Sequence, residues 1–452
     1  MEFLTGTLSA VFWGLIVLSL LVVVHESGHF LVARLCGVRV TEFFLGMPSR
    51  HRISFKSRKH GTEFGVTPLL LGGYNRICGM ESIQDDLLSE VISFVYRRGS
   101  VRVSDVCDRF LIDEDRAYAI LMTLTDWASV RLDDAEDPDD PVFRTIPRDG
   151  SFLCEYDDGH DQEVIAEHSD GDAYDVPMAP DEFLAHERSH VYQGMGFWKR
   201  LAMLVMGALV NIVFALLIVT FSLSVIGIDA GSTEPVIGTV YEDSLAASAG
   251  IQPGDTVTRI GDHDIATWYD ISDALDELLV AGSSFDIAVE RDGSSQILHI
   301  DIPEGDAPEL LGITNTIVKV RLPLKDAVAS AFDYAGQVAR FALRLINPAH
   351  TMEVVGQSSS IVGMSVMASE AAASGAFDLL LVIAAISMSL GFMNLLPIPP
   401  LDGGKILFEI IQLAIGRPVS IKVQNIVSYV GLGLLFVLFV FVLRNDIVNY
   451  IM

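Results

Sequence analysis

The sequence contains few basic residues: 30 lysines and arginines stand against 59 aspartates and glutamates, so the formal net charge is −29. Binding to nucleic acid needs basic patches that neutralise phosphates, and we therefore expect no nucleic-acid partner. Cysteine is scarce as well. The 4 cysteines, Cys36, Cys78, Cys107 and Cys154, lack C-x-x-C spacing. This pattern predicts reduced thiols on the cytoplasmic side and no disulfide framework.

Apolar residues, in contrast, make up half of the 452 residues, and the mean hydropathy is +0.42. A chain that is both apolar and strongly acidic is expected to join membrane spans to acidic soluble parts. Long apolar runs predict four transmembrane helices, at about Val11–Ala33, Trp198–Ile226, Leu379–Leu396 and Ile426–Leu443. Basic residues gather after the first run and between the last two, which places these loops in the cytoplasm and both termini outside it. We therefore predict a polytopic α-helical membrane protein.

The first apolar run contains the sequence His25-Glu26-Ser27-Gly28-His29. On a helix, histidines four residues apart lie on one face, and the glutamate lies beside a metal ion that they could hold. Titratable side chains are costly at the depth of a bilayer, so a functional role is expected for them. The pattern predicts a zinc hydrolase with its active site inside the membrane and Glu26 as the general base.

A catalytic zinc needs three protein ligands, so one must come from another part of the chain. The strongest candidate is Asp402, which lies in a stretch rich in proline and glycine next to the third apolar run. Such helix breaks occur in membranes only where they line a buried or water-filled site. A helix cap is the alternative role for Asp402. Two asparagines in the apolar runs, Asn394 and Asn211, could assist substrate, or could only hydrogen-bond between helices.

A second copy of the histidine motif, His186-Glu187-Arg188-Ser189-His190, lies in a polar, acidic region without an apolar flank. We interpret it as a solvated helix that precedes the second span. If this copy held the metal, the protein would be a membrane-anchored protease with a cytoplasmic active site. Alanine at His186 or His190 would then abolish activity.

Residues 84–193, called the insertion below, contain 28 acidic and 9 basic residues and hold −19 of the net charge. The order helix, Val101–Ser104, helix, Asp113–Asp115, helix resembles a small winged-helix domain. The later part, Asp133–Asp140 and Asp157–Asp175, is poor in large apolar residues and is expected to be loosely ordered. The acidity of the insertion favours a regulatory or protein-binding role over DNA binding.

Shorter patterns predict strands and one amphipathic helix. Residues 52–80 are strand-like, with a turn or bulge at Gly72-Gly73. Residues 229–305 combine short strands (Val236–Val240 and Thr256–Ile260), a helix at Trp268–Val280 and a hairpin around Asp292-Gly293. A helix beside an open sheet edge suits the addition of a peptide strand. In the linker that follows, Leu324–Ile346 is expected along the outer membrane face.

The chain resembles the bacterial regulator-of-sigma-E group of site-2 proteases, which are intramembrane zinc metalloproteases. The motifs that carry the resemblance are H-E-x-G-H in the first span, Leu71-Gly72-Gly73-Tyr74, G-x-x-x-N ending at Asn211, Ala249–Asp255, and N-x-x-P-x-P-x-L-D-G from Asn394. The resemblance implies six parts: residues 1–83 with the first span and a membrane-associated β-hairpin, the insertion 84–193, the second span 194–228, one PDZ domain 229–305, an outer linker 306–375, and the last two spans 376–452.

The same resemblance implies that His25, His29 and Asp402 bind Zn²⁺ and that Glu26 is the catalytic base. It also implies a set of substrate-binding residues: Asn394, Asn211, Leu71, Gly72, Gly73 and Tyr74. The expected reaction is peptide-bond hydrolysis in single-span membrane proteins, such as anti-sigma factors or remnant signal peptides, during regulated intramembrane proteolysis at the bacterial inner membrane. The PDZ domain is expected to bind a peptide or substrate segment.

The sequence departs from this family in places. Val355-Gly356-Gln357-Ser358 stands where the family has Gly-Pro, no proline precedes Asn211, and the insertion is not a usual family part. Two other classes remain open on the sequence, a catalytically silent scaffold that displays the PDZ domain and a metal-handling transporter. A scaffold would not need both metal-ligand motifs, and a transporter would place polar residues along several spans.

Overall fold

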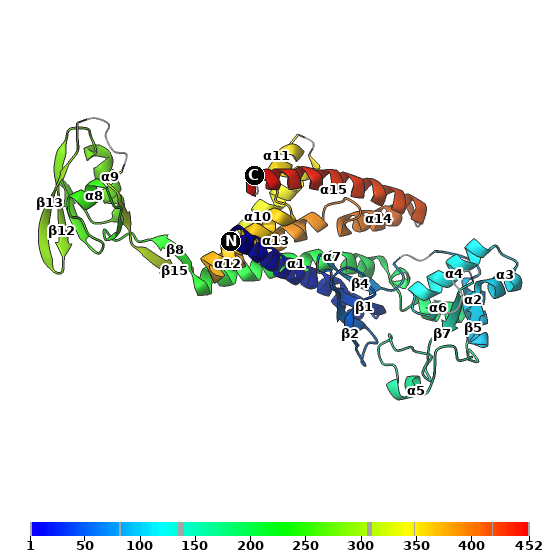
Figure 1. Cartoon of the computed structure of the whole chain (residues 1–452). Helices are drawn as coiled ribbons and strands as arrows, with labels where there is room; N and C mark the ends of the chain where they lie inside the picture. The colour runs from blue at the N-terminus through cyan, green and yellow to red at the C-terminus, as the bar shows by residue number, and fades with distance from the viewer. Residues whose placement is uncertain are drawn as a thin grey trace. The chain divides into compact units, whose positions relative to one another are not determined.

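The computed structural model describes residues 2–80, 83–133, 140–304, 310–347, 349–417 and 419–450. The chain divides into two compact units, of which unit 1 comprises Met1–Val219 and Val328–Met452, and unit 2 comprises Thr220–Ala327. Figure 1 follows both units along the chain.

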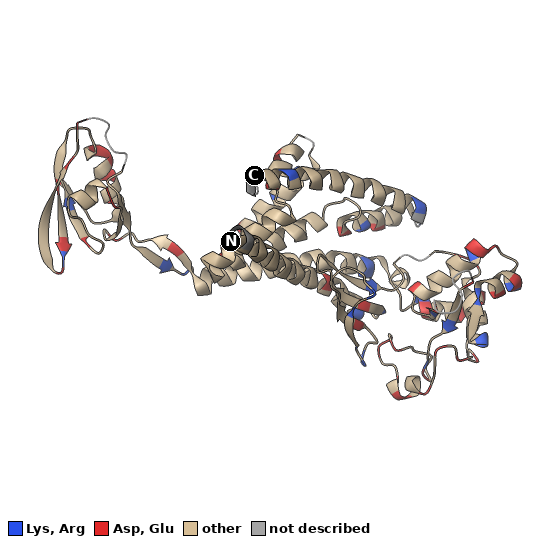
Figure 2. Cartoon of the chain, viewed as in Figure 1, with Lys and Arg blue, Asp and Glu red and all other residues tan. Residues whose placement is uncertain are grey.

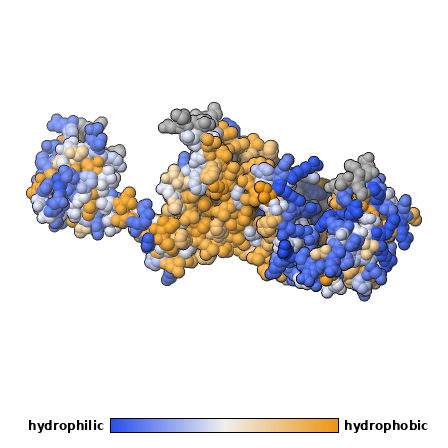
Figure 3. Space-filling model, turned by 60° about the horizontal axis from the view of Figure 1, so that its bottom comes forward, coloured by the Kyte–Doolittle hydropathy of each residue, from blue (hydrophilic) through white to orange (hydrophobic). Residues whose placement is uncertain are grey.

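Long apolar helices form the body of unit 1: α1 (Glu2–Leu35), α7 (Phe197–Phe221), α13 (Ala376–Asn394) and α15 (Ile421–Tyr450). Among the described residues, four helices are long and apolar enough to cross a membrane, at Thr5–Leu35, Phe197–Ile226, Ala376–Asn394 and Lys422–Val448. Each coincides with a predicted span, although the first begins earlier than expected. Figure 3 shows hydrophobic residues over the surface of these helices, and Figure 2 shows few charged residues on them. Such a surface is stable in hydrocarbon, not in water.

Shorter helices complete the helical part of the chain: α10 (Leu324–Ile346), α11 (Thr351–Gln357), α12 (Ile361–Ser374) and α14 (Asp402–Ile415). Helix α10 has the bounds that the amphipathic pattern predicted. The N-terminus of α12 is held by α15, because the Asp446 carboxylate accepts hydrogen bonds from the backbone N–H groups of Ser360 (2.6 Å) and Gly363 (3.2 Å). Burying an acid against free N–H groups at a helix start is favourable.

A four-stranded sheet follows α1. Its strands are β1 (Val40–Leu45), β2 (Ile53–Lys56), β3 (Glu63–Val66) and β4 (Gly73–Ile77), in the order β2-β3-β1-β4. The sequence predicted strands only from Arg52 onward and so missed β1. Because β1 lies between β3 and β4, the expected hairpin is part of a four-stranded sheet. Strand β1 runs parallel to β3 and antiparallel to β4, which leaves β4 at an edge.

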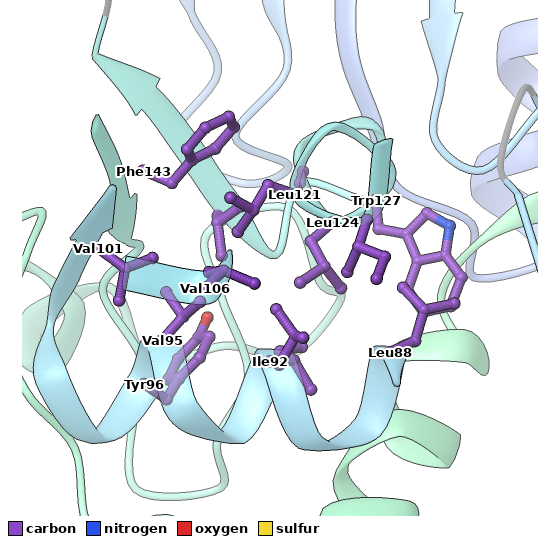
Figure 4. Packing of buried hydrophobic residues seen from close by; sticks show 14 of the residues in the cluster. Leu88, Ile92, Val95, Tyr96, Val101, Val106, Leu121, Leu124, Trp127 and Phe143 are labelled. Carbon is purple, nitrogen blue, oxygen red and sulfur yellow. The ribbon is translucent and has the colours of Figure 1, made fainter. Parts of the chain in front are cut away.

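The insertion has its own core. Its elements are α2 (Leu88–Arg98), β5 (Ser100–Arg102), α3 (Val103–Phe110), α4 (Glu114–Asp126), β6 (Val130–Asp133) and β7 (Val142–Thr145), with the sheet order β5-β7-β6. The first four elements follow the predicted order. Figure 4 shows apolar side chains of the helices and of β7 packed together, among them Ile92, Leu121, Trp127 and Phe143, which are fully buried. Three short helices follow: α5 (Gln162–Ala166), α6 (Pro180–Arg188) and η1 (Tyr192–Gly194).

A buried ion cluster joins the insertion to the chain after α1. The Arg39 guanidinium donates to Asp157 at 2.6 and 2.7 Å and to Glu187 at 2.7 Å, and Arg148 donates to both oxygens of Glu187 at 2.8 Å. All four side chains are fully buried. The structure thus differs from the expected loose ordering at Asp157, because two buried arginines require two buried acids nearby. Residues 134–139 of the expected loose segment lie outside the described residues.

Unit 2 is rich in strands. Its elements are η2 (Ser222–Ile226), β8 (Ile228–Gly231), β9 (Ile237–Val240), α8 (Leu245–Ser248), β10 (Thr256–Ile260), β11 (His263–Asp264), α9 (Trp268–Leu278), β12 (Ser284–Arg291), β13 (Ser294–Asp301), β14 (Ile313–Asn315) and β15 (Ile317–Val320). The larger sheet has the order β11-β10-β12-β13, and β9 pairs with β14. The predicted strands, helix and hairpin are confirmed as β9, β10, α9 and β12–β13.

Candidate active site

Three candidate metal ligands meet between α1 and α14. His25 and His29 lie one turn apart on α1, and Asp402 is the first residue of α14. Asp402 Oδ2 lies 3.1 Å from His25 Nε2 and 3.2 Å from His29 Nε2, and the two Nε2 atoms are 3.2 Å apart. Among the described residues, this is the one group of three or more His, Cys, Asp or Glu side chains whose ligand atoms lie within 4.8 Å of one another.

The triangle of ligand atoms fits a zinc ion. Nitrogen and oxygen ligands about 2.0–2.1 Å from a tetrahedral zinc lie about 3.3 Å from each other. The observed separations of 3.1–3.2 Å therefore match three of the four positions of such a site. Two histidines and one carboxylate are also a donor set that catalytic zinc sites use, with the fourth position left for water.

The second nitrogen of each histidine is turned toward α7. His29 Nδ1 lies 2.7 Å from the backbone oxygen of Met203, which can only accept, so His29 carries its proton on Nδ1 and leaves Nε2 for a metal. His25 Nδ1 lies 3.4 Å from Asn211 Nδ2, while Asn211 Oδ1 is buried without a partner among the described residues. The two ends of an amide are interchangeable in such an assignment. Exchanging them lets Oδ1 accept a hydrogen bond from His25 Nδ1.

Glycines bring α1 and α7 close enough for these contacts. A Cβ atom at Gly207 would overlap Nε2 of His29, and one at Gly28 would lie 2.5 Å from the backbone oxygen of Met206. Both glycines belong to the motifs that the sequence singled out, H-E-x-G-H and G-x-x-x-N. Small residues at a helix crossing let the two backbones approach, and here the approach places α7 against the histidines.

A cavity of about 210 Å³ opens beside the three ligands. It is lined by His25, Glu26, His29, Gly73, Tyr74, Asn75, Ile77, Met80, Tyr192, Met203, Leu204, Asp402 and Lys405. Edge strand β4 thus forms one wall, with α1, α7 and α14 forming the others. Glu26 is fixed at this wall, since Asn75 Nδ2 donates to its Oε2 at 2.7 Å and to its backbone oxygen at 3.1 Å.

Helix α14 is held in place one turn beyond the cavity. Glu409 lies seven residues after Asp402 and so faces the same side of the helix. Its carboxylate accepts a hydrogen bond from the Tyr192 hydroxyl at 3.0 Å and pairs with Arg200 at 3.0 Å. These contacts tie α14 to the start of α7 and to the end of the insertion, and so fix the direction in which Asp402 points.

Comparison with known proteins identifies the family. Residues 13–438 match the model of peptidase family M50. The chain belongs to peptidase family M50. It is similar to the regulator of sigma-W protease RasP of Bacillus subtilis, with 26% identity over 96% of this chain and 97% of the relative. It is also similar to the zinc metalloprotease RasP of Geobacillus kaustophilus (26%, covering 98% and 99%) and to the probable protease eep of Enterococcus faecalis (27%, covering 96% and 98%).

The site of this M50 peptidase contains only some of the residues predicted for substrate. Gly73 and Tyr74 line the cavity, whereas Leu71, Gly72 and Asn394 do not. Asn394 is half-buried at the end of α13, and its role in substrate binding stays a prediction. Asn211 is fully buried against His25, away from the cavity wall.

The other residues that line the cavity were not predicted as site residues: Asn75, Ile77, Met80, Tyr192, Met203, Leu204 and Lys405. Asn75 carried a usable signal, because it directly follows the predicted segment Leu71–Tyr74 and is two residues from Gly73, on the same face of a strand. Lys405 is one turn after Asp402 on the helix that begins there. Nothing in the local sequence indicated that Tyr192 or Met203 would reach the site.

The second histidine motif has a different environment. Glu187 is fully buried and bound to two arginines, so it is not free to act on water, and the motif is not the solvated helix that we expected. Burial alone would raise the pKa of Glu187, but the guanidinium groups of Arg148 and Arg39 lower it well below its usual range. Among the described residues, no third metal-ligand side chain joins His186 and His190.

Proposed function

We propose that this M50 peptidase is an intramembrane zinc metalloprotease that hydrolyses peptide bonds in single-span membrane proteins. One observation carries the proposal: the ligand atoms of His25, His29 and Asp402 lie within 3.2 Å of one another, although His29 and Asp402 are 373 residues apart in the sequence, and Glu26 lines the same cavity. The helix that supplies both histidines is apolar enough to cross a membrane. The zinc metalloprotease RasP relatives support the metal.

In this proposal His25, His29 and Asp402 hold the zinc ion. Zinc bound there supplies a Lewis acid that polarises the scissile carbonyl and lowers the pKa of water to about 7. Glu26 takes the proton from the attacking water and passes it to the amine of the leaving fragment. Asn211 keeps the His25 ring oriented, as Met203 does for His29. Asn394 assists substrate, as the family resemblance implies.

The substrate is proposed to bind as an extended strand along β4. A helix must unwind before a protease can reach its peptide bonds, because its backbone groups are otherwise paired. Strand β4 is at the edge of its sheet and carries Gly73 and Tyr74 on the cavity wall. Addition of a strand to such an edge satisfies the backbone of the unwound segment and presents it to Glu26. Leu71 and Gly72 precede β4 and would guide the segment into it.

The remaining proposals concern topology and partners. The four apolar helices are proposed to span the bacterial inner membrane, with both termini outside the cytoplasm. Unit 2 is proposed to be a PDZ domain that binds a peptide or substrate segment outside the cytoplasm. The insertion, whose order of helices and strands resembles a winged-helix domain, is proposed as a cytoplasmic regulatory module. Anti-sigma factors and remnant signal peptides are the proposed substrates, and the name of the Bacillus subtilis relative, regulator of sigma-W protease, supports the former.

The test is cleavage of a tagged single-span substrate, shortened on its outer side, coexpressed with wild type and three variants. Loss of cleavage with Glu26→Gln and Asp402→Ala, together with full cleavage by His186→Ala, is the expected result. Loss with His186→Ala alone would move the active site into the insertion. No cleavage by any form, across several shortened substrates, would contradict the proposal and favour a silent scaffold.

A further inference from the structure

Strand β4 crosses helix α1 with alternate residues turned toward it. A Cβ atom at Gly73 would lie 2.6 Å from Val22 Cγ1, so Gly73 faces α1 and leaves no room for a side chain. Asn75, two residues on, reaches Glu26. Two strand residues advance about 6.8 Å and one helix turn about 5.4 Å. The two advances are similar in length, so Asn75 contacts Glu26 one helix turn after Gly73 contacts Val22.

The Asn75 amide makes two hydrogen bonds to a single residue. Its Nδ2 donates to Glu26 Oε2 at 2.7 Å and to the Glu26 backbone oxygen at 3.1 Å. Both partners can only accept, so the amide is oriented with its NH₂ group toward Glu26. The same group thus ties the carboxylate to its own backbone, which restricts the side-chain torsions of Glu26. The contact involves Oε2 and leaves Oε1 outside it.

We propose that Asn75 is a positioning residue that holds the Glu26 carboxylate in its working orientation, and that it does so from the strand that receives substrate. The proposal rests on the proposed function, in which Glu26 is the general base. Among the described residues, β4 has one strand neighbour, β1, and its other edge is open beside the cavity. The contact is already present in the structure, so a substrate strand that pairs with this edge meets a base that is held in place.

This role predicts a specific kinetic pattern. A hydrogen bond to a charged group that is needed for the chemical step changes the rate by about ten- to a hundredfold. Asn75→Leu, which keeps the size but removes the donor, should lower kcat by about that factor and change KM by less than about twofold. Asn75→Asp puts a second carboxylate against Glu26 and should lower kcat at least as much. Asn75→Gln keeps the NH₂ group on a longer stem and should recover part of the loss.

The experiment measures kcat and KM for a purified single-span substrate with the full-length wild type and these three variants, together with zinc content and thermal stability. Ser54→Ala is the matched control, because Ser54 donates to the Glu63 carboxylate at the far edge of the same sheet, away from the cavity. A second readout needs no turnover: substrate affinity is compared between Glu26→Gln and the double variant Glu26→Gln, Asn75→Leu, and should be equal.

The expected result is a lower kcat in Asn75→Leu and Asn75→Asp, partial recovery in Asn75→Gln, and unchanged zinc content, stability and affinity. Wild-type kcat in Asn75→Leu and Asn75→Asp would overturn the positioning role while leaving the proposed function intact. A raised KM with wild-type kcat, or loss of zinc, would overturn it too, by assigning Asn75 to substrate binding or to folding. Absence of zinc-dependent cleavage in wild type and in Ser54→Ala would instead overturn the proposed function, and the inference with it.

Discussion

Replacing Glu187 with glutamine should destabilise the insertion strongly while leaving the proposed metal ligands, His25, His29 and Asp402, untouched. Glu187 is the shared counter-ion of two fully buried arginines. After the substitution Arg39 keeps its bidentate partner Asp157, but Arg148 keeps only neutral partners, the Tyr96 hydroxyl and the backbone oxygen of Phe152. An uncompensated buried charge of this kind lowers the free energy of unfolding by about 3–5 kcal/mol.

Two buried cysteines offer a local probe of this loss. Cys154 lies in the insertion, and Cys78, which precedes it, is part of its hydrophobic core. Both are buried, and burial raises the pKa of the Cys154 thiol to about 12, so neither should react with a maleimide while the insertion is folded. The partly exposed Cys36 and Cys107 are replaced by serine to remove background labelling. If labelling follows transient opening, a loss of about 3–5 kcal/mol raises the labelling rate by about two to four orders of magnitude.

Charge balance supplies the decisive comparison. The double variant Glu187→Gln, Arg148→Met removes one charge of each sign and leaves the Arg39–Asp157 pair neutral. It should label more slowly than Glu187→Gln alone. Arg148 and Glu187 are direct partners, so removing both should recover about 2 kcal/mol of the free energy of unfolding that Glu187→Gln loses. Asp181→Asn, an exposed acid on the same helix, is the matched control and should label like wild type. Additive effects of the two substitutions, or wild-type labelling of Glu187→Gln, would refute the reasoning.

Three further outcomes are expected. Gly207→Val places atoms where Nε2 of His29 lies, so zinc measured by elemental analysis should fall below half of the wild-type content while the helical content measured by circular dichroism is unchanged; full zinc content would contradict the packing argument. Glu409→Leu removes the acceptor that anchors α14 and should lower activity at least about tenfold with zinc retained only in part, and wild-type activity would show that the anchor is dispensable. The folded-state pKa values of Glu187 and Asp157 lie below their usual range, because their arginine partners outweigh the effect of burial. The stability that they contribute is present above the unfolded pKa values, about 4, and falls as the pH drops below them. Because the thiolate fraction itself changes with pH, the labelling rate is divided by that of the urea-unfolded protein at the same pH; this ratio should rise below about pH 4 and stay constant between pH 6 and 8.

The sequence determined the parts of this protein that depend on local pattern. Apolar length gave the four long helices, because a run of that length can be buried only in a membrane or a large core. The spacing of His25 and His29 placed both on one helix face, and the break around Asp402 marked the third candidate ligand before any contact was known. In unit 2 the alternation of residues and the turn at Asp292-Gly293 predicted the hairpin, because strand period and turn chemistry are local properties.

Only the tertiary structure decided which distant residues share a site. Whether Asp402 meets His25 depends on how α14 packs against α1 and α7. That packing needs residues without a side chain, such as Gly207, because a Cβ atom there would overlap His29. The role of Glu187 is the clearest case: its motif is the same as that of Glu26, yet two arginines from elsewhere in the chain turn it into a buried counter-ion. For Asn75, the sequence indicated its strand face, and only the packing of β4 against α1 showed that it reaches Glu26. A local pattern fixes which face a side chain occupies, whereas the chemistry of that side chain is set by neighbours that the fold brings to it from distant parts of the sequence.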